Sequence, residues 1–382
     1  MKLRVLFMSS WFPSKAHPTL GNFVQYHAEA VSRFCEVTVI YIAKLPHEKN
    51  LFLEEEIVNN VRVVRVYYNK NGILFSNRFK ALKKGLAHLK NIHFNPNIIH
   101  FNVIWPDGWE ALYASKKLKI PFCITDHWTG YHADEREPLN FFQKLYMRFI
   151  ANRTARLLPV THHMGQAMQR IGFKAKITVV PNVVNTSIFK PNSESPNEYQ
   201  FLHISHLGDD HKNISGILRT WKKVTSQFNN IHLNIGGDGP IDHWKSVARS
   251  LEIPPSSISF FGTLSKEQVA HQMMQSNCFV LFSNFENLPL VMIEAMCCGL
   301  TVITTDVGGC REFLPLDHGH FLIKKKDEDA LLNAFVQAIG QKYDQLEKKK
   351  TISEYASKTF SNEAIGHQFN TIYHSILKID AK

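Results

Sequence analysis

The sequence predicts an α/β protein with two parallel-sheet domains, and three observations support this. The chain has 382 residues, more than one hydrophobic core usually serves. Short apolar runs alternate with amphipathic segments in both halves, a pattern typical of βαβ units with helices on both faces of a sheet. Residues 190–199 are polar, contain two prolines and separate the two series, so we expect them to be the linker.

The first domain, residues 1–189, contains seven runs that we expect to be buried strands. They are Lys2–Met8, Glu36–Ile42, Val61–Tyr67, Asn97–Phe101, Pro121–Thr125, Ala155–Val160 and Lys176–Val180. The first run is too short for a signal peptide and polar residues follow it at once, which favours a strand. Gly21–Phe34 has apolar residues at helical spacing.

The second domain, residues 200–360, repeats the alternation. The predicted strands are Phe201–Ser205, Ile231–Ile235, Ile258–Phe261, Cys278–Phe282 and Thr301–Thr304, and the predicted helices include Ile214–Phe228, Lys266–Gln275 and Leu290–Cys297. Residues 361–382 are predicted to be a helix that crosses back to the first domain. Two such sheets would face each other across a cleft, with ligands beyond the carboxyl ends of the strands.

The two halves of the chain differ in charge. Residues 1–190 carry 26 Lys and Arg against 12 Asp and Glu, a formal charge of +14, whereas residues 191–382 carry 18 against 21. We therefore expect the first half to meet an anionic partner. The six cysteines show no paired metal spacing and no stretch has the ~20 apolar residues of a membrane helix, which favours a cytoplasmic protein with reduced thiols.

The segment that follows Cys278–Phe282 is the most specific feature of the chain. Asn287 is suited to be an N-cap and Pro289 to a first helical turn. A strand, a loop and a helix start present free N–H groups and a positive dipole, which suit a diphosphate. Glu286 and Glu294 flank this helix start, so one can accept hydrogen bonds from a sugar and the other from a ribose. Solvated or surface-paired glutamates are the alternative, but Glu294 stands in a strongly apolar helix, where an unpaired carboxylate is costly.

This segment resembles the paired-glutamate signature of glycosyltransferase family 4, two glutamates with seven residues between them. Further motifs continue the resemblance over residues 181–312. They are Pro181-Asn182-Val183-Val184-Asn185, Gly236-Gly237-Asp238-Gly239-Pro240, Phe260-Phe261-Gly262, Glu294-Ala295-Met296 and Gly308-Gly309-Cys310-Arg311-Glu312. The resemblance implies a GT-B fold, two Rossmann-like domains facing across a cleft, and a retaining transferase that uses a nucleotide-diphosphate sugar.

The resemblance also assigns roles in the second domain. It makes Glu286 catalytic, through the sugar hydroxyls, and makes the following residues donor-binding: His206, Lys212, Gly237, Gly262, Asn287, Leu288, Leu290 and Glu294. His206 is a departure, because the family usually has Arg at that position. A neutral imidazole binds phosphate poorly unless it becomes protonated beside a dianion, and a loop histidine without a role is the alternative.

In the first domain the resemblance points to two places. His127 follows Pro121–Thr125 and matches a histidine that the family carries near the transferred sugar, although a lone histidine is more often structural. Gly21 and Asn22 match the site where backbone approaches the donor phosphate, with an ordinary helix start as an equal alternative.

A basic amphipathic segment lies between residues 75 and 90. Its apolar residues are Phe75, Phe79, Leu82, Leu86 and Leu89, and its cations are Arg78, Lys80, Lys83, Lys84 and Lys90. It is either a core-facing helix with a solvated cationic face or a site of attachment to anionic lipid.

Together these features predict a glycosyltransferase that moves a sugar from a UDP- or GDP-linked donor to a glycan or lipid-linked acceptor. We expect a role in surface polysaccharide or glycolipid assembly, at the inner face of the membrane, with no metal, no other cofactor and no nucleic acid. A nucleotide-sugar epimerase on the same fold is one alternative, and a non-catalytic binder of anionic polymers, supported by the basic half alone, is another.

Overall fold

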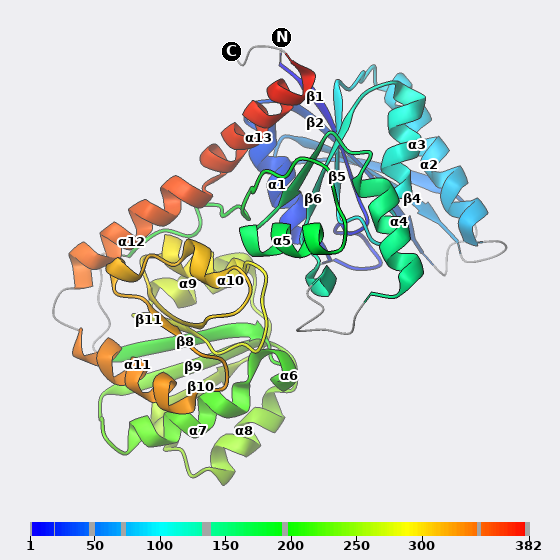
Figure 1. Ribbon diagram of the computed structural model, residues 1–382. Helices are drawn as coiled ribbons and strands as arrows, with labels where there is room; N and C mark the ends of the chain where they lie inside the picture. Colours follow the sequence, from blue (N-terminus) through cyan, green and yellow to red (C-terminus); the bar gives the residue numbers. More distant parts are fainter. Residues whose placement is uncertain are drawn as a thin grey trace. The chain divides into compact units, whose positions relative to one another are not determined.

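A computed structural model describes residues 2–18, 20–45, 50–69, 74–131, 139–192, 198–341 and 345–378. The chain divides into two compact units (Figure 1). Unit 1 comprises Met1–Val183 and Asn362–Lys382, and unit 2 comprises Val184–Ser361. No helix in the described ranges is long and apolar enough to cross a bilayer.

Unit 1 is built on a seven-stranded sheet with the order β3-β4-β2-β1-β5-β6-β7. Its strands are β1 (Arg4–Ser9), β2 (Glu36–Lys44), β3 (Phe52–Val58), β4 (Val61–Tyr68), β5 (Ile98–Asn102), β6 (Phe122–Asp126) and β7 (Arg156–Pro159). All neighbours are parallel except β3 and β4, which form an antiparallel pair at the edge. The sequence analysis missed β3, because Glu54-Glu55-Glu56 hides the apolar alternation on which strand prediction relies.

The predicted strand Lys176–Val180 is wrong. The segment runs beside β7 but forms a single bridge, between Ile177 and Leu157. The Val180 N–H donates to the Pro159 carbonyl at 3.1 Å, but Pro159 has no N–H to return a hydrogen bond. The ladder therefore ends before it becomes a strand.

Helices cover unit 1. They are α1 (Asn22–Ser32), α2 (Leu74–Asn91), α3 (Trp109–Leu118), α4 (Phe141–Ala151), α5 (His162–Arg170) and α13 (Asn362–Leu377). The basic segment forms α2, whose Leu82, Leu86 and Leu89 are buried, while its lysines are exposed. The core-facing interpretation of this stripe is therefore correct; the side chain of Phe75 lies outside the described part.

Unit 2 contains a six-stranded parallel sheet with the order β10-β9-β8-β11-β12-β13. Its strands are β8 (Tyr199–His206), β9 (Ile231–Asp238), β10 (Ile258–Phe261), β11 (Cys278–Leu281), β12 (Thr301–Thr305) and β13 (Phe321–Ile323). Its helices are α6 (Asp209–Lys212), α7 (Ile214–Thr225), α8 (Ile241–Ser250), α9 (Lys266–Met274), α10 (Leu290–Cys297), α11 (Glu328–Gly340) and α12 (Gln345–Phe360). All five strands predicted for this half are present.

The chain enters unit 2 at Val184, earlier than the predicted linker at 190–199. The Val184 N–H donates to the Phe360 carbonyl at 2.8 Å, and Phe189 is buried, so residues 184–189 pack with unit 2. Residues 193–197 of the predicted linker lie outside the described part. After Ser361 the chain returns to unit 1 as α13.

Helices α1 and α13 pack at unusually close range (Figure 1). A Cβ added to Gly366 of α13 would lie 2.2 Å from the carbonyl oxygen of Ala30 in α1, so only glycine permits this approach. Ile365, Phe369 and Tyr373 of α13 belong to the core of unit 1.

We expect Gly366→Ala to lower the free energy of unfolding by about 1–3 kcal/mol, because the added methyl must push two helix backbones apart. Gly340→Ala is the matched control, since nothing lies within 4 Å of its added Cβ. That control should be neutral or slightly stabilising. Urea unfolding of both variants measures the difference, and equal midpoints would contradict the close-packing argument.

Candidate active site

The predicted residues of unit 2 gather where the order of its sheet reverses. From β8 the chain continues to β9 on one side of the sheet, while from β11 it continues to β12 on the other. The carboxyl ends of β8 and β11 therefore carry loops that diverge, and open α/β sheets bind ligands at such a point. His206 ends β8, Lys212 ends the short helix after it, and Glu286 follows β11.

A buried ion pair joins these two loops. The Lys212 ammonium donates to Oε1 of Glu286, and each side chain is only 8% exposed. The same carboxylate oxygen accepts a hydrogen bond from the Ser283 hydroxyl at 2.7 Å. Since an ammonium has three donors, Lys212 can hold the carboxylate and still contact an anion beside it.

The loop after β12 supports Glu286 from the other side. Gly308 has a φ of +56°, and a Cβ there would lie 1.8 Å from the Glu286 carbonyl oxygen. The Gly309 N–H donates to the Asn287 carbonyl at 2.7 Å. The two adjacent glycines therefore let this loop lie directly on the backbone of Glu286 and Asn287.

Helix α10 begins immediately after this loop. Its N-cap is Pro289 and its first residue is Leu290, so the prediction of Asn287 as N-cap is wrong. Pro289 has an extended backbone, with a ψ of 120°, so helical geometry begins only at Leu290. The N-cap Pro289 has no side-chain oxygen to cap α10, so the first N–H groups and positive dipole end of the helix suit an anion. Leu288 is buried and Leu290 half-buried at this start.

Glu294 lies on the buried side of α10, one turn beyond the helix start. Burial raises the pKa of its carboxyl to about 7, against a small opposing effect of Lys266. In the described ranges no group donates a hydrogen bond to this carboxyl. A buried acid with a raised pKa at a loop edge is typical of a functional group.

Two histidines connect the loops further. Nε2 of His211 donates to the Phe285 carbonyl at 2.6 Å, so its Nδ1 accepts from Nε2 of His206 at 2.8 Å. Burial lowers the pKa of His211 to about 4, which keeps this ring neutral. His206 is thus oriented by a residue that the sequence analysis missed, although His211 stands in the same loop.

The two predicted glycines of unit 2 differ in their surroundings. Gly237 has a φ of +130°, and a Cβ there would lie 1.8 Å from the Ser205 carbonyl oxygen, so glycine is required. Gly262 follows β10 and has nothing within 4 Å of an added Cβ. Packing therefore explains Gly237, while Gly262 leaves open space beside its backbone.

In unit 1 the predicted residues also lie together, at the carboxyl edge of the sheet. Gly21 has a φ of +74° and caps α1, and a Cβ there would lie 2.5 Å from the Trp11 carbonyl oxygen. Asn22 opens that helix, and Phe23 packs against the His127 ring at 4.1 Å between centroids. This packing brings the start of α1 to His127.

Buried polar groups hold His127. The Asp126 side chain accepts hydrogen bonds from the backbone N–H of His127 at 2.8 Å and from the Tyr131 hydroxyl at 2.6 Å. These bonds fix the backbone turn between residues 126 and 131. Burial, His27 and His100 lower the pKa of His127 well below its usual value, while a hydrogen bond with Asn182 opposes this. His127 is therefore a neutral imidazole, suited to hydrogen bonding and proton transfer but not to holding a phosphate by charge.

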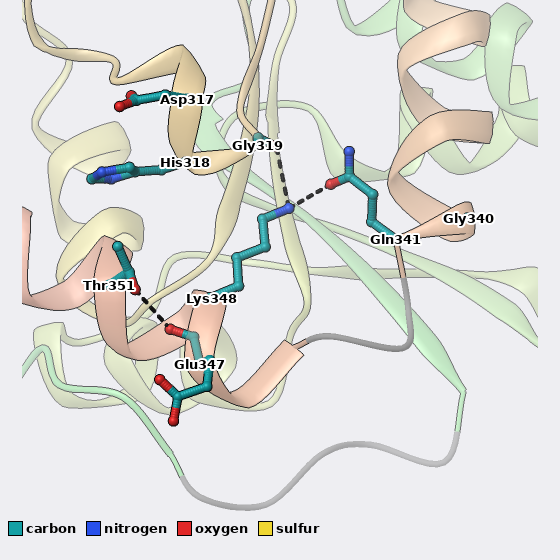
Figure 2. Close-up of a pocket in the computed structure, with 8 residues that line it drawn as sticks. All are labelled: Asp317, His318, Gly319, Gly340, Gln341, Glu347, Lys348 and Thr351. Carbon is teal, nitrogen blue, oxygen red and sulfur yellow. Dashed lines mark hydrogen bonds between the residues drawn. The ribbon is translucent and has the colours of Figure 1, made fainter.

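A separate pocket of about 520 Å³ lies elsewhere in unit 2 (Figure 2). Its lining includes His318 and Lys348, and the Lys348 ammonium donates to the Gly319 carbonyl and the Gln341 side chain. None of the predicted site residues lines this pocket, so it is not the candidate active site.

Comparison with known families accounts for nearly the whole chain. Residues 184–359 match the family described as glycosyl transferases group 1, and residues 20–188 match glycosyltransferase family 4. TuaC of Bacillus subtilis, named for teichuronic acid biosynthesis, is 23% identical over 97% of this chain and 99% of its own length. The gpi3 subunit of the Schizosaccharomyces pombe phosphatidylinositol N-acetylglucosaminyltransferase is 23% identical over 70% of this chain and 58% of that protein.

A solved structure agrees in fold. HepE of Anabaena, solved in complex with UDP and glucose, superimposes on this chain with a TM-score of 0.74 and 15% sequence identity. The aligned region covers 98% of this chain and 100% of the HepE chain. Each of the two units thus has the strands and helices of a Rossmann-like domain of the GT-B fold.

We expect Lys212→Met to lower the free energy of unfolding by about 3 kcal/mol, because it leaves the Glu286 carboxylate buried without its cation. Adding Glu286→Gln to the same chain should restore most of that loss, since no buried charge remains. Arg311→Met, which removes an exposed pair with Asp306, is the control and should change stability little. Urea unfolding tests all three, and a double variant no more stable than Lys212→Met would rule out this coupling.

Proposed function

Because the chain belongs to glycosyltransferase family 4, we propose that it transfers a sugar, with retention of configuration, from a UDP- or GDP-linked donor to a glycan or lipid-linked acceptor. The observation that carries this proposal is the Lys212–Glu286 ion pair at the reversal point of the second sheet. A cation suited to a diphosphate lies there beside a carboxylate suited to sugar hydroxyls, and this supports the proposal.

Each residue has a defined task in this proposal. Lys212 and the first N–H groups of α10 stabilise the leaving diphosphate, with His206 as a further donor once protonated beside it. Glu286 binds sugar hydroxyls and Glu294 the ribose. The neutral His127 contributes to the transfer step, as the family resemblance implies.

We also propose that transfer needs no metal ion. Metal-dependent transferases often bind the ion through an Asp-x-Asp sequence. One such sequence is present, Asp327-Glu328-Asp329, but its side chains make contacts within the protein. Asp327 caps α11 by accepting from the Ala330 N–H at 2.9 Å, and Glu328 pairs with Arg219. This sequence therefore does not argue for a metal-bound donor.

The names of relatives support a donor and a class of acceptor. HepE was solved with UDP and glucose, which favours a UDP-linked sugar. TuaC is named for teichuronic acid biosynthesis and gpi3 for transfer to phosphatidylinositol, which favours assembly of a polysaccharide or a glycolipid.

Incubating the protein with UDP- and GDP-linked sugars, without acceptor, tests the function. We expect one of them to bind and to be hydrolysed slowly, and Glu286→Gln to lower that rate by about 10²-fold while nucleotide affinity changes little. Glu328→Gln, at the surface of the same unit, is the control. Conversion of the sugar into its epimer would identify an epimerase instead, and neither binding nor turnover would favour a binder of anionic polymers.

The raised pKa of Glu294 predicts a pH dependence of nucleotide binding. Below pH 7 the carboxyl is protonated and loses its charge-assisted hydrogen bonds to ribose, so affinity for the bound nucleoside diphosphate should rise by about tenfold from pH 6 to pH 8. Glu294→Gln should bind more weakly and lack this contribution. Calorimetry measures the nucleotide affinity of both proteins at each pH. Protonation of the nucleotide affects both proteins equally, so it cancels in the difference between their affinities. Parallel pH profiles of the two proteins would refute the ribose assignment.

A further inference from the structure

Helix α4 has apolar side chains on two opposite faces. Met147, Ile150 and Ala151 are buried in unit 1. The other face, here called the α4 apolar face, consists of Phe141, Phe142, Leu145 and Phe149, whose exposed fractions are 72%, 78%, 53% and 52%. Three of these residues recur at intervals of four, so they form one stripe along the helix.

This stripe stands out from the rest of the surface. Seven large apolar side chains are exposed in the described ranges, and four of them belong to this one helix. Isolated exposed apolar residues are ordinary, but a contiguous group marks a contact surface. The helix needs no such residues for its own stability, because a capping box at Asn140 and Gln143 and a buried face already hold it.

The chain that follows Asp134, Glu135 and Glu137 and forms the stripe is basic. From Pro138 to Ser193 the sequence contains eight Lys and Arg and no Asp or Glu. The Arg153 guanidinium lies 3.7 Å from the centroid of the Phe149 ring, and Arg148 is exposed on the same helix. The Lys174 N–H donates to the Asn152 side chain at 2.7 Å, which brings another exposed cation to the end of α4.

We propose that the α4 apolar face binds the surface of a bilayer that contains anionic lipid. Aromatic and leucine side chains would enter the boundary between headgroups and acyl chains, and the flanking cations would contact lipid phosphates. A second copy of the chain fits this face less well, because a two-fold interface would oppose cations to cations.

The position of α4 connects this surface to the proposed function, on which this step rests. The helix runs from the carboxyl end of β6 to the start of β7, so Phe141 and Phe142 lie toward the sheet edge that carries His127. Binding there would hold that edge near the membrane, where a lipid-linked acceptor resides.

Helix α2, the other basic amphipathic segment, does not offer such a surface. Its apolar side packs on β2 and β4. The acidic strand β3 lies beside its cations, since Nε2 of His88 hydrogen-bonds to Glu55 at 2.6 Å. Over residues 76–91, the part of α2 whose side chains are described, no exposed apolar stripe accompanies the cations, and acidic side chains of β3 lie beside them.

Flotation of the full-length chain with vesicles tests the proposal. At low salt we expect it to float with phosphatidylcholine vesicles that contain a third phosphatidylglycerol and not with phosphatidylcholine alone. The double variant Phe142→Ser, Phe149→Ser should bind at least about tenfold more weakly. Leu316→Ser, an exposed apolar residue of unit 2, and Lys80→Gln with Lys83→Gln on α2 are controls that should keep most of the binding.

Equal flotation of the double variant and the parent would overturn the proposal, as would equal binding to neutral vesicles. A dimer in the absence of lipid that the double variant abolishes would assign the face to a second copy instead. A circular dichroism spectrum and a urea unfolding midpoint equal to those of the parent show that the double variant is folded. Since flotation uses no nucleotide sugar, its failure leaves the proposed transferase untouched, and absence of hydrolysis leaves the membrane proposal untouched.

Discussion

The ion pair between Lys212 and Glu286 constrains much of unit 2. Two charges removed from water are tolerated only when they face each other, so the loops after β8 and β11 must meet. Once they meet, Glu286 lies directly before α10 and the loop after β12 must cross its backbone, which Gly308 allows. The cation, the carboxylate and the start of α10 are therefore held in place by contacts within the protein, a requirement for electrostatic catalysis.

At the carboxyl edge of its sheet, unit 1 has buried neutral histidines, whereas unit 2 has a buried ion pair. The sequence of unit 1 is basic, yet burial lowers the pKa values of His27, His100 and His127, so these three imidazoles are neutral. His100 hydrogen-bonds to Tyr373 of α13 at 2.6 Å and to Thr125 of β6 at 2.7 Å. His127 thus packs against the rings of Phe23 and the neutral His27, which fix its position.

Sequence patterns predicted most strands, since buried parallel strands are apolar along their whole length. They missed β3, where charged residues occupy an edge, and β13, which has only three residues. They also predicted a strand at residues 176–180, where one missing N–H stops the ladder. For the candidate site, family motifs predicted Glu286, Lys212 and His127, but the contacts that Ser283, His211 and Asn182 make with site residues depend on tertiary structure. The exposed stripe of α4 escaped attention because an amphipathic pattern does not reveal which face is covered.

The return of the chain to unit 1 has a consequence for biosynthesis. Unit 2 is continuous, from Val184 to Ser361, whereas the core of unit 1 is incomplete without Phe369 and Tyr373. During translation the N-terminal strands emerge first, yet their core closes only after α13 has left the ribosome. The apolar side of α1 is thus the last surface to be covered, and a nascent chain halted before residue 362 would present it to chaperones.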